Sequence, residues 1–524
     1  MPCSKETRVD ERVQSALTLL PDYLGQHVLL SAAALLLGLA VSAPLVVLAQ
    51  RNARVRWPVL AFVSIIQTVP SLALLALFYP LLLALSSLSQ KLFGHGFAAL
   101  GFLPSLLALT LYSMLPIVRN GVTGLSNIDP AVLEAARGVG MTPRQSLFRV
   151  ELPLAMPVIM AGIRTSAVWV IGTATLSTPV GQTSLGNYIF SGLQIENWVS
   201  VLFGCVSAVA LALVADQLLA LVENGVATRR PMRIWLGLAL LVVGVGAAIA
   251  PSIHAAKSAY VIGAKSFSEQ YILADLMADR ISRAGSPVTQ RVGLGSVIAF
   301  KALASDEIDA YVDYSGTVWA NVLNRKDSLP RAKMLEEMTR LLKDKYGVTL
   351  LGALGFENAY ALAMRADQAR SLNVRTIADL APHAGELRLG TDFEFLARPE
   401  WAALRDTYGL AFREQRQYQS TFMYRAVAGS EVDVISAFSS DGRIAAYNLL
   451  VLEDAKQVIL PYDAIVLLAP RRANDDRLRG ALTPLIGAVS IEPMREANQM
   501  VDRDENKRSP AQAAQWLAEK AGLK

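Results

Sequence analysis

The sequence predicts an α-helical membrane domain of about six transmembrane helices, followed by an α/β domain outside the membrane. Three observations support this fold class. Charged residues are concentrated in the second half of the chain, the first half contains six long apolar stretches, and the second half alternates short apolar runs with amphipathic helical patterns. With 524 residues, the chain is long enough for more than one folding unit.

The charge distribution separates the two halves. Residues 1–256 contain 15 Lys and Arg and 10 Asp and Glu, whereas residues 257–524 contain 34 of each kind. The first composition suits lipid and the second suits water. The net charge of +5 therefore belongs to the membrane half, where short loops carry it. It gives no reason to expect nucleic acid as a partner, whereas membrane lipid is an expected one.

Six apolar stretches approach or exceed the roughly 20 residues that a helix needs to cross a bilayer. Pro70 and Pro80 interrupt the second stretch, so we expect its outer end to be kinked or to lie at the membrane surface. The predicted spans are residues 28–49, 58–86, 98–118, 157–180, 199–222 and 234–253.

Positive charges in alternate loops set the predicted orientation, because Lys and Arg are retained on the cytoplasmic side. The loops at about 87–97 and 181–198 carry only Lys91. This pattern predicts a multi-pass protein of the bacterial cytoplasmic (inner) membrane, with residues 1–27 and the C-terminal half outside. The cytoplasmic arginines would be Arg51, Arg54, Arg56, Arg119, Arg137, Arg144, Arg149, Arg229, Arg230 and Arg233.

The sixth span, within residues 226–257, has two interpretations. It anchors the extracytoplasmic domain, or it is a cleaved secretory signal, since arginines precede it and Ala255 and Ala256 follow it. We expect it to be retained as an anchor, because cleavage would release a domain that gains effective concentration from its tether.

The sequence has no pattern typical of a metal site, a cofactor site or an enzyme. Cys3 and Cys205 are the only cysteines, and there is no HExxH, GxSxG or Gly-rich phosphate loop. The histidines, which also lack ligand spacing, are His27, His95, His254 and His383. We therefore expect a chain without cofactor or metal that is not itself an enzyme.

The loop at residues 129–157 lies between the third and fourth spans and carries helix signals. Asp129 followed by Pro130 is a helix start, with Asp as the cap and Pro in the first helical position. Gly140 permits a sharp turn, after which Thr142-Pro143 begins a second segment. We expect a short helix, a turn and a further helical segment.

The same loop contains Glu134-Ala135-Ala136, then Gly140 and Leu152-Pro153 at matching offsets. This string resembles the EAA signature of ABC importer permeases, whose short cytoplasmic helix docks in a groove of the ATPase. The resemblance implies that residues 28–225 form the permease domain. It also implies that two copies of this chain work with a separate ATPase dimer that binds ATP and Mg²⁺. The coupling residues would be Glu134, Ala135, Ala136 and Gly140.

The C-terminal half carries the motifs GAKSFSEQYILADLMADRI, GLGS and DEIDAYVDYSGTVWAN. These resemble the substrate-binding proteins of osmoprotectant ABC importers over most of residues 258–524. The resemblance implies a type II periplasmic-binding-protein fold, in which two α/β lobes close on a ligand and the chain crosses between them twice. Lobe one would comprise residues 258–361 and 463–524, and lobe two residues 362–462.

In that family aromatic rings surround a trimethylammonium head. Such a cation cannot donate hydrogen bonds but is attracted to ring faces, by about 0.5–2 kcal/mol each. Carried over position by position, the rings would be Tyr314, Tyr360, Phe438 and Tyr462. The alternative for each ring is an ordinary place in the core or at the rim of a lobe.

The resemblance also implies a site for the ligand carboxylate. Lys265 and Arg398 match the family positions that bind it, Arg by its bidentate fork and Lys as a point charge. Thr317 and Gln270 would add hydrogen bonds, and Asn358 stands where the family places a polar group against the ammonium head. The alternative for Lys265 is a surface lysine.

Departures from the family pattern bear on the ligand. Family members often carry Tyr where this chain has Phe438, EYTGT where it has DYSGT, and Asp-Gly where it has Glu400-Trp401. A ring without its hydroxyl and a shifted Asp313 would suit a bulkier ligand, such as carnitine or ergothioneine.

We therefore expect a fused permease and substrate-binding subunit of an ATP-driven importer for a quaternary-ammonium zwitterion, such as glycine betaine or carnitine. An importer of the same architecture for ergothioneine is the first alternative, and a plain cation such as choline fits the anion site less well. A membrane-anchored ligand sensor is the alternative class. A secondary transporter would need coupling-ion groups at mid-membrane, where we expect Asp216 to be structurally paired or to snorkel.

Overall fold

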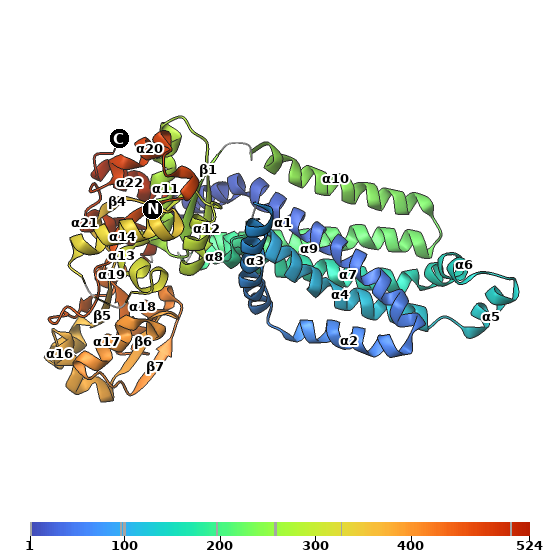
Figure 1. The fold of residues 1–524 in the computed structure, drawn as a ribbon, viewed down its shortest axis with the longest axis horizontal. Helices are drawn as coiled ribbons and strands as arrows, with labels where there is room; N and C mark the ends of the chain where they lie inside the picture. The colour runs from blue at the N-terminus through green and yellow to red at the C-terminus, as the bar shows by residue number, and fades with distance from the viewer. Residues whose placement is uncertain are drawn as a thin grey trace. The chain divides into compact units, whose positions relative to one another are not determined.

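A computed structural model of the chain describes residues 3–94, 97, 101–194, 197–255, 259–325, 327, 329–503 and 506–523. The chain divides into a helical unit within residues 1–257 and an α/β unit within residues 258–524 (Figure 1). His95, one of the histidines without ligand spacing, and Ala256, part of the possible cleavage site, lie outside the described residues.

Among the described residues, six helices are long and apolar enough to cross a bilayer, which confirms the predicted number. α1 is continuous from Cys3 to Arg51, so part of the segment 1–27 belongs to the first helix rather than preceding it. The other long helices are α3 (Ser71–Phe93), α4 (Phe102–Ser126), α7 (Leu152–Ala174), α9 (Trp198–Ala227) and α10 (Pro231–Ala255).

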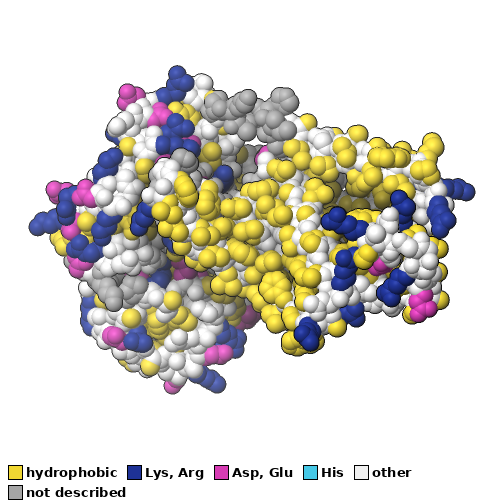
Figure 2. Space-filling model, turned by 45° about the vertical axis from the view of Figure 1, so that its right-hand side comes forward, with side chains coloured by type: hydrophobic (Ala, Val, Ile, Leu, Met, Phe, Trp, Pro, Cys, Tyr) yellow, Lys and Arg dark blue, Asp and Glu magenta, His cyan; other side chains and the backbone are white. Residues whose placement is uncertain are grey.

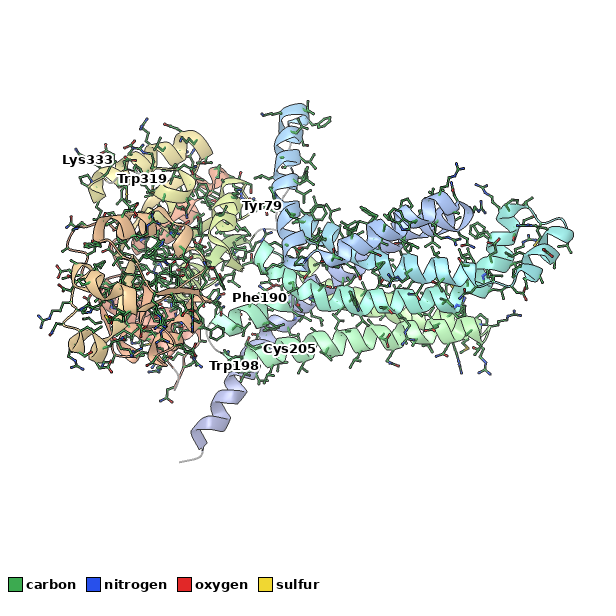
Figure 3. The ribbon with its side chains drawn as sticks, turned by 90° about the horizontal axis from the view of Figure 1, so that it is seen from below. Tyr79, Phe190, Trp198, Cys205, Trp319 and Lys333 are labelled. Carbon is green, nitrogen blue, oxygen red and sulfur yellow. The ribbon has the colours of Figure 1, made fainter. Side chains whose placement is uncertain are left out.

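The predicted second span consists of two helices, α2 (Ala53–Thr68) and α3. The chain breaks at Val69-Pro70, where Val69 is extended because the following proline disfavours the helical conformation. Pro80, by contrast, lies inside α3 without ending it. At 16 residues α2 is about 24 Å long, shorter than the ~30 Å hydrocarbon core. α3 runs across the direction of the other long helices (Figures 1 and 3).

α4 lies at the centre of the helical unit, where it packs against α1, α2, α3 and α7. Small residues allow these contacts to be close, as is common between membrane helices. A Cβ atom at Gly162 of α7 would lie 2.6 Å from the carbonyl oxygen of Pro116 in α4. A Cβ atom at Gly121 of α4 would similarly lie 2.7 Å from a side-chain methyl carbon of Val46 in α1. The bundle therefore depends on glycine at these crossings.

The surface of the helical unit agrees with the predicted orientation. A broad apolar belt covers its length, and Lys and Arg side chains gather at one end (Figure 2). That end contains the end of α1, the loop at residues 127–151 and the turn between α9 and α10 (Figure 1). These segments, with the adjoining ends of α2, α4 and α10, carry the ten arginines predicted to be cytoplasmic, so this end is cytoplasmic.

The loop at residues 127–151 forms the two helical segments expected from its signals. α5 (Pro130–Gly138) is capped by Asp129, whose carboxylate accepts the Ala131 N–H at 2.9 Å. Gly140 turns with a φ of 79°, and α6 (Pro143–Ser146) begins with a capping box from Thr142. A π-helical segment, Leu147–Glu151, then leads into α7.

The predicted coupling residues on this loop differ in exposure. Glu134 and Ala135 are exposed, but Ala136 is 5% exposed, in a helix that packs against the chain's own α6 and π-helical segment. Ala136 therefore offers little exposed surface to a partner, and its part in coupling stays a prediction. Val139 and Phe148 are 74% and 65% exposed, although the sequence did not single them out.

Asp216 is paired, as expected. The sequence analysis did not identify its partner. Arg164 of α7 makes a bidentate pair with Asp216 of α9, with both N–O distances at 2.8 Å. Its remaining nitrogen, Nη1, lies 2.7 Å from Glu223, two turns further along α9. One arginine thus holds two carboxylates and joins α7 to α9 inside the bundle.

The first lobe of the α/β unit is built on a mixed five-stranded sheet of order β2-β1-β3-β10-β4. β1, β2 and β3 run parallel, whereas β10 is antiparallel to β3 and β4. The strands are β1 (Tyr260–Lys265), β2 (Val288–Leu294), β3 (Ala310–Tyr314), β4 (Thr349–Glu357) and β10 (Asp463–Leu468). Helices of this lobe include α11 (Ser268–Arg283), α12 (Ser296–Ala304), α14 (Arg331–Tyr346), α21 (Ile491–Asp502) and α22 (Pro510–Lys520).

The second lobe repeats the arrangement with a sheet of order β7-β6-β8-β5-β9. Its strands are β5 (Tyr360–Arg365), β6 (Arg388–Thr391), β7 (Glu414–Gln417), β8 (Val434–Phe438) and β9 (Leu449–Val451). Its helices include α17 (Pro399–Tyr408), α18 (Ser420–Ala428) and α19 (Arg443–Ala446). Both sheets are mixed rather than largely parallel, because β10 runs antiparallel to β3 and β5 runs antiparallel to β8.

The chain crosses between the lobes at residues 358–359 and again at residues 452–462. The two crossings are hydrogen-bonded to each other, since the Asn358 N–H donates to the Tyr462 carbonyl at 3.0 Å. β5 already pairs with β8 from Tyr360 onward. The predicted boundary after residue 361 is therefore too late, and lobe two begins at Tyr360.

The Arg164 pairs yield a prediction about stability. Arg164→Met leaves two carboxylates of α9 without a cation at membrane depth, whereas Asp216→Asn keeps the pair with Glu223. We expect Arg164→Met to lower the unfolding temperature in detergent by roughly 5–10 °C, corresponding to about 3 kcal/mol, and Asp216→Asn to have a much smaller effect. Thermal unfolding followed by tryptophan fluorescence measures this. Equal shifts in both variants would contradict the shared role of Arg164.

Candidate functional site

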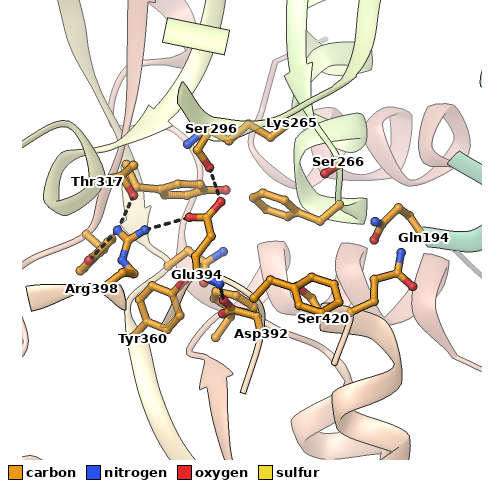
Figure 4. Close-up of a pocket in the computed structure, with 18 of the residues that line it drawn as sticks. Gln194, Lys265, Ser266, Ser296, Thr317, Tyr360, Asp392, Glu394, Arg398 and Ser420 are labelled. Carbon is orange, nitrogen blue, oxygen red and sulfur yellow. Dashed lines mark hydrogen bonds and ion pairs between the residues drawn. The ribbon is translucent and has the colours of Figure 1, made fainter. Parts of the chain in front are cut away.

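A cavity of about 200 Å³ lies between the two lobes of the α/β unit. Its walls come from strand ends of lobe one, from β5, β8 and the segment 392–398 of lobe two, and from both crossings (Figure 4). Cavities at the junction of two lobes are typical ligand sites, because closure can surround the ligand.

The structure brings all four predicted rings to this cavity. Tyr360 is the central ring: its centroid lies 5.0 Å from that of Phe438 and 6.0 Å from that of Tyr462. Tyr314 completes the group from lobe one. These four residues are called the aromatic cage below. None of them is an ordinary core residue confined to the interior of one lobe.

Each cage residue occupies a strand end. Tyr314 ends β3, Phe438 ends β8, Tyr360 begins β5, and Tyr462 directly precedes β10. Tyr360 and Phe438 are register partners in the β5–β8 ladder, which places their rings side by side. Gly316 allows Tyr462 to approach, because a Cβ atom there would lie 2.6 Å from its ring carbons.

A fifth ring, Phe267, was missed by the sequence analysis. It stacks between Tyr314 and Phe438, with centroid distances of 6.1 and 6.5 Å. It therefore links the lobe-one and lobe-two rings of the cage. Its place in the GAKSFSEQ motif, two residues after Lys265, was the available signal.

Arg398 faces the cavity and spans the cleft. From lobe two it donates to the Thr317 hydroxyl of lobe one at 3.2 Å and to the Tyr462 hydroxyl at 3.1 Å. Its guanidinium lies over the Tyr360 ring, 4.9 Å from the centroid. Thr317, one of the predicted hydrogen-bonding residues, thus lines the cavity and holds Arg398.

The carboxylate of Glu394 lies between Arg398 and Ser296 (Figure 4). Arg398 donates to it at 3.1 Å and the Ser296 hydroxyl donates at 3.3 Å. Ser296 is the first residue of α12, so the positive end of that helix dipole is at this point. The Glu394 side chain is 50% exposed. Arg398, Ser296 and the start of α12 thus form a position that accepts a carboxylate.

Lys265 lines the cavity but is already paired. Its ammonium contacts the Asp313 carboxylate, and both side chains are almost fully buried, at 3% and 1% exposure. Asp313 also accepts the Tyr311 hydroxyl at 2.5 Å and the Tyr314 N–H at 2.7 Å. Lys265 is therefore neither a surface lysine nor an unengaged cation for a ligand carboxylate.

Gln270 does not line the cavity, contrary to the expectation that it hydrogen-bonds a ligand. Its amide donates to the Tyr314 hydroxyl at 3.1 Å and its oxygen accepts the Lys265 N–H at 3.3 Å. Asn358 does line the cavity, at the first crossing. Gln270 thus orients Tyr314 of the cage from outside the cavity.

The tyrosine hydroxyls of the cage are neutral hydrogen-bonding groups. Burial raises the pKa of Tyr314, Tyr360 and Tyr462 above the ordinary value of a phenol. Burial also raises the pKa of the Asp392 carboxyl, which lines the same cavity. The rings therefore present neutral faces rather than phenolate charges at physiological pH.

The ion pair between Lys265 and Asp313 can be tested by measuring thermal stability. Lys265→Met leaves Asp313 buried without a cation, which typically costs about 3–5 kcal/mol, so we expect a clear fall in the unfolding temperature. Adding Asp313→Asn to the same chain should recover much of the loss, because no buried charge then remains. Thermal unfolding of the three proteins gives the answer. Unchanged stability in Lys265→Met together with lost ligand binding would instead make Lys265 a ligand contact.

Both units match known families. Residues 34–228 match the family described as the binding-protein-dependent transport system inner membrane component. Residues 258–519 match the substrate-binding domain of the ABC-type glycine betaine transport system. Together the two matches account for most of both units.

Similar proteins have the same two parts, fused or separate. An ergothioneine transport permease/ergothioneine binding protein of Helicobacter pylori is 27% identical over 490 residues, covering 90% of this chain and 85% of that protein. A choline transport system permease protein of Bacillus subtilis is 42% identical over 199 residues, 38% of this chain and 84% of that protein. A crystal structure of a glycine betaine/carnitine/choline ABC transporter is 28% identical, with a TM-score of 0.45, and covers 50% of this chain and 99% of that one.

These matches agree with the six apolar helices, the arginine-rich cytoplasmic end and the two-lobed domain with its interlobe cavity. They make the protein a multi-pass inner-membrane protein whose binding domain is extracytoplasmic. The chain belongs to the ABC importers for betaine- and osmoprotectant-type substrates, with the permease and the substrate-binding domain fused in one polypeptide.

Proposed function

We propose that this chain imports a small quaternary-ammonium zwitterion of the glycine betaine or carnitine type. In this proposal the aromatic cage holds the ammonium head, and Arg398 with Ser296 holds the carboxylate. The observation that carries it is the convergence of the four cage rings from both lobes and both crossings on one cavity.

The cage suits a permanently charged nitrogen. A trimethylammonium group has no N–H to donate, so carboxylates and carbonyls offer it little directional bonding. Ring faces attract it by about 0.5–2 kcal/mol each, and more where water is excluded. Tyr314, Tyr360 and Tyr462 are each less than 10% exposed, so a ligand among them would be largely desolvated.

The carboxylate position supports a zwitterion over a plain cation. Glu394 is half exposed, and a ligand carboxylate could take its place between Arg398 and Ser296 while Glu394 turns to solvent. Arg398 lies over the Tyr360 ring, so the two charged ends of the ligand would bind side by side. A short betaine has this spacing of charges.

Ergothioneine is the second candidate, because the relative that covers 90% of this chain is an ergothioneine transport protein. Phe438 in place of a tyrosine removes one hydroxyl from the cavity. Against it, a cavity of about 200 Å³ lies below the roughly 300–1,000 Å³ of sites for drug-sized ligands. That volume favours the smaller betaines.

Lobe closure supplies the transport step on the extracytoplasmic side. A ligand that contacts Arg398 and Phe438 in lobe two and Tyr314 in lobe one stabilises the closed arrangement, because only that arrangement offers both sets of contacts. The two short crossings would act as the hinge. The closed domain then delivers its ligand to the permease.

A ligand panel on the full chain in detergent tests the substrate. We expect glycine betaine, proline betaine or carnitine to bind more tightly than choline. Phe438→Ala should weaken all of them about tenfold or more, since it removes one face of the cage. Arg398→Ala should weaken the zwitterions but not choline. Isothermal titration gives the affinities. Tightest binding of ergothioneine would select the second candidate, and no response to any ligand of the panel would reject the cage as an ammonium site.

We further propose that α5 docks on a separate ATPase, with two copies of this chain facing an ATPase dimer. Val139, at the end of α5, and Phe148, in the π-helical segment, are exposed in the loop between α4 and α7. Exposed apolar side chains in such a place fit a protein partner. Glu134 and Ala135 lie on the exposed side of α5 beside them.

Charge reversal tests this docking surface. Glu134→Lys should abolish co-purification of the ATPase and ligand-stimulated ATP hydrolysis, while ligand binding stays unchanged. Glu386→Lys, an equal change on an exposed residue of the binding domain, is the matched control. Pull-down from cells that express both subunits measures it. Retention of the ATPase by Glu134→Lys would exclude α5 as its main contact.

A further inference from the structure

Glu269 is the centre of a polar network behind the aromatic cage. It lies in the first turn of α11 and is 3% exposed. Its Oε1 accepts the Tyr314 hydroxyl at 2.6 Å and the Asn358 amide at 3.1 Å. Its Oε2 accepts the Ser440 hydroxyl at 2.6 Å and the Asn498 amide at 2.7 Å. Both oxygens are thus fully used by donors from four separate segments.

These bonds fit an ionised carboxylate. The amide nitrogens of Asn358 and Asn498 can only donate. The Tyr314 oxygen already accepts from Gln270 at 3.1 Å, so its own proton points to Glu269. Burial raises the pKa of Glu269 above its usual value, and the four donors, which stabilise the charged form, oppose that rise only in part. A proton on Oε1 would lie against the Tyr314 and Asn358 hydrogens, and on Oε2 the Ser440 hydroxyl is the one partner that could accept it.

The negative charge of Glu269 is not neutralised by a neighbouring cation. Within the described part of the chain, no Lys or Arg nitrogen is within 4 Å of its carboxylate. The cations around the two cavities are each engaged elsewhere: Arg443 with Asp441, Lys265 with Asp313, and Arg398 with Glu394 and Glu400. A buried carboxylate without a cation is costly even when it is hydrogen-bonded, and a cation bound nearby would offset part of that cost.

The charge lies directly behind the rings. Glu269 lines a small cavity of about 40 Å³ together with Phe267, Asn358 and Phe438, and it does not line the main cavity. Its closest link to the cage is the Tyr314 hydroxyl. A phenol that donates to a carboxylate has a more electron-rich ring, and the face of such a ring attracts a cation more strongly.

We propose that Glu269 is the counter-charge of the ligand's quaternary nitrogen, a buried carboxylate whose field reaches the aromatic cage through Tyr314. This rests on the proposed function of the cage. It gives the cavity a means to select charge as well as shape. Aromatic faces also bind a neutral tert-butyl group of the same size, whereas a fixed negative charge favours only the ammonium.

A counter-charge and a purely structural role make different predictions. If Glu269 only joined the crossing, lobe two and α21, its loss would weaken every ligand alike. If it acts by charge, its loss weakens ligands with a quaternary nitrogen and spares a ligand with a quaternary carbon in the same place. Glycine betaine and 3,3-dimethylbutanoate are such a pair, since both carry the same carboxylate and differ only at that atom.

The experiment measures the affinities of the full chain in detergent for both compounds by isothermal titration and by competition. We expect wild type to prefer glycine betaine, and Glu269→Gln to reduce that preference about tenfold or more, the order expected for one uncompensated charge several Å away at an effective dielectric constant of about 20. Tyr314→Phe keeps the ring but removes the hydroxyl, so we expect a severalfold reduction. Ser440→Ala keeps the charge, so it should weaken both compounds equally and preserve the preference.

The outcomes are distinct. A preference unchanged in Glu269→Gln, or equal losses for both compounds, overturns the counter-charge. If Glu269→Gln does not fold, Tyr314→Phe decides, and an unchanged preference there overturns the proposal. Wild type that binds no quaternary-ammonium compound would instead reject the proposed function itself. A reduced preference in both variants with an intact one in Ser440→Ala supports it.

Discussion

The two crossings between the lobes are the constraint on which the binding domain depends. They bring the end of β8, the start of β5 and the start of β10 to one place, and the Asn358 N–H bond to the Tyr462 carbonyl holds the crossings together. Side chains alternate along a strand, so a shift of one residue in the β5–β8 register would turn Tyr360 or Phe438 away from the cavity. The geometry of the cage is thus a property of the backbone ladder.

The charges around the cavity fall into fixed and exchangeable pairs. Lys265 and Asp313 are both almost fully buried, so separating them would leave a buried charge without a partner. Glu394 is half exposed, and its carboxylate can move to water at little cost while Arg398 accepts another. Of the two cations that the sequence suggested for a ligand carboxylate, only Arg398 has a partner that a ligand could replace. The difference lies in the exposure of the partners, not in the cations themselves.

Sequence patterns predicted the division into two units and the number of long membrane helices, and the family resemblance indicated the four rings of the cage. They could not predict pairings between distant residues. Nothing in the sequence shows that Asp313 faces Lys265, that Ala136 turns inward, or that Arg164 lies opposite Asp216, because each depends on how separate segments pack. The sequence also did not show that the helix breaks at Pro70 but continues through Pro80, because a proline disfavours a helix at both places alike.

Fusion changes what the binding domain must achieve. A separate binding protein has to find its permease by diffusion, whereas a domain on the same chain is present at an effective concentration set by the linker, of order mM for a short one. A tethered domain therefore needs less affinity for its permease than a separate one does. Discrimination between ligands then depends on the few groups that contact or polarise the cage. A buried carboxylate distinguishes a charged ligand from a neutral one more strongly than neutral rings do. Four hydrogen bonds offset part of the free energy that the Glu269 charge costs in the empty domain, and a cation that enters the cage would offset more of it.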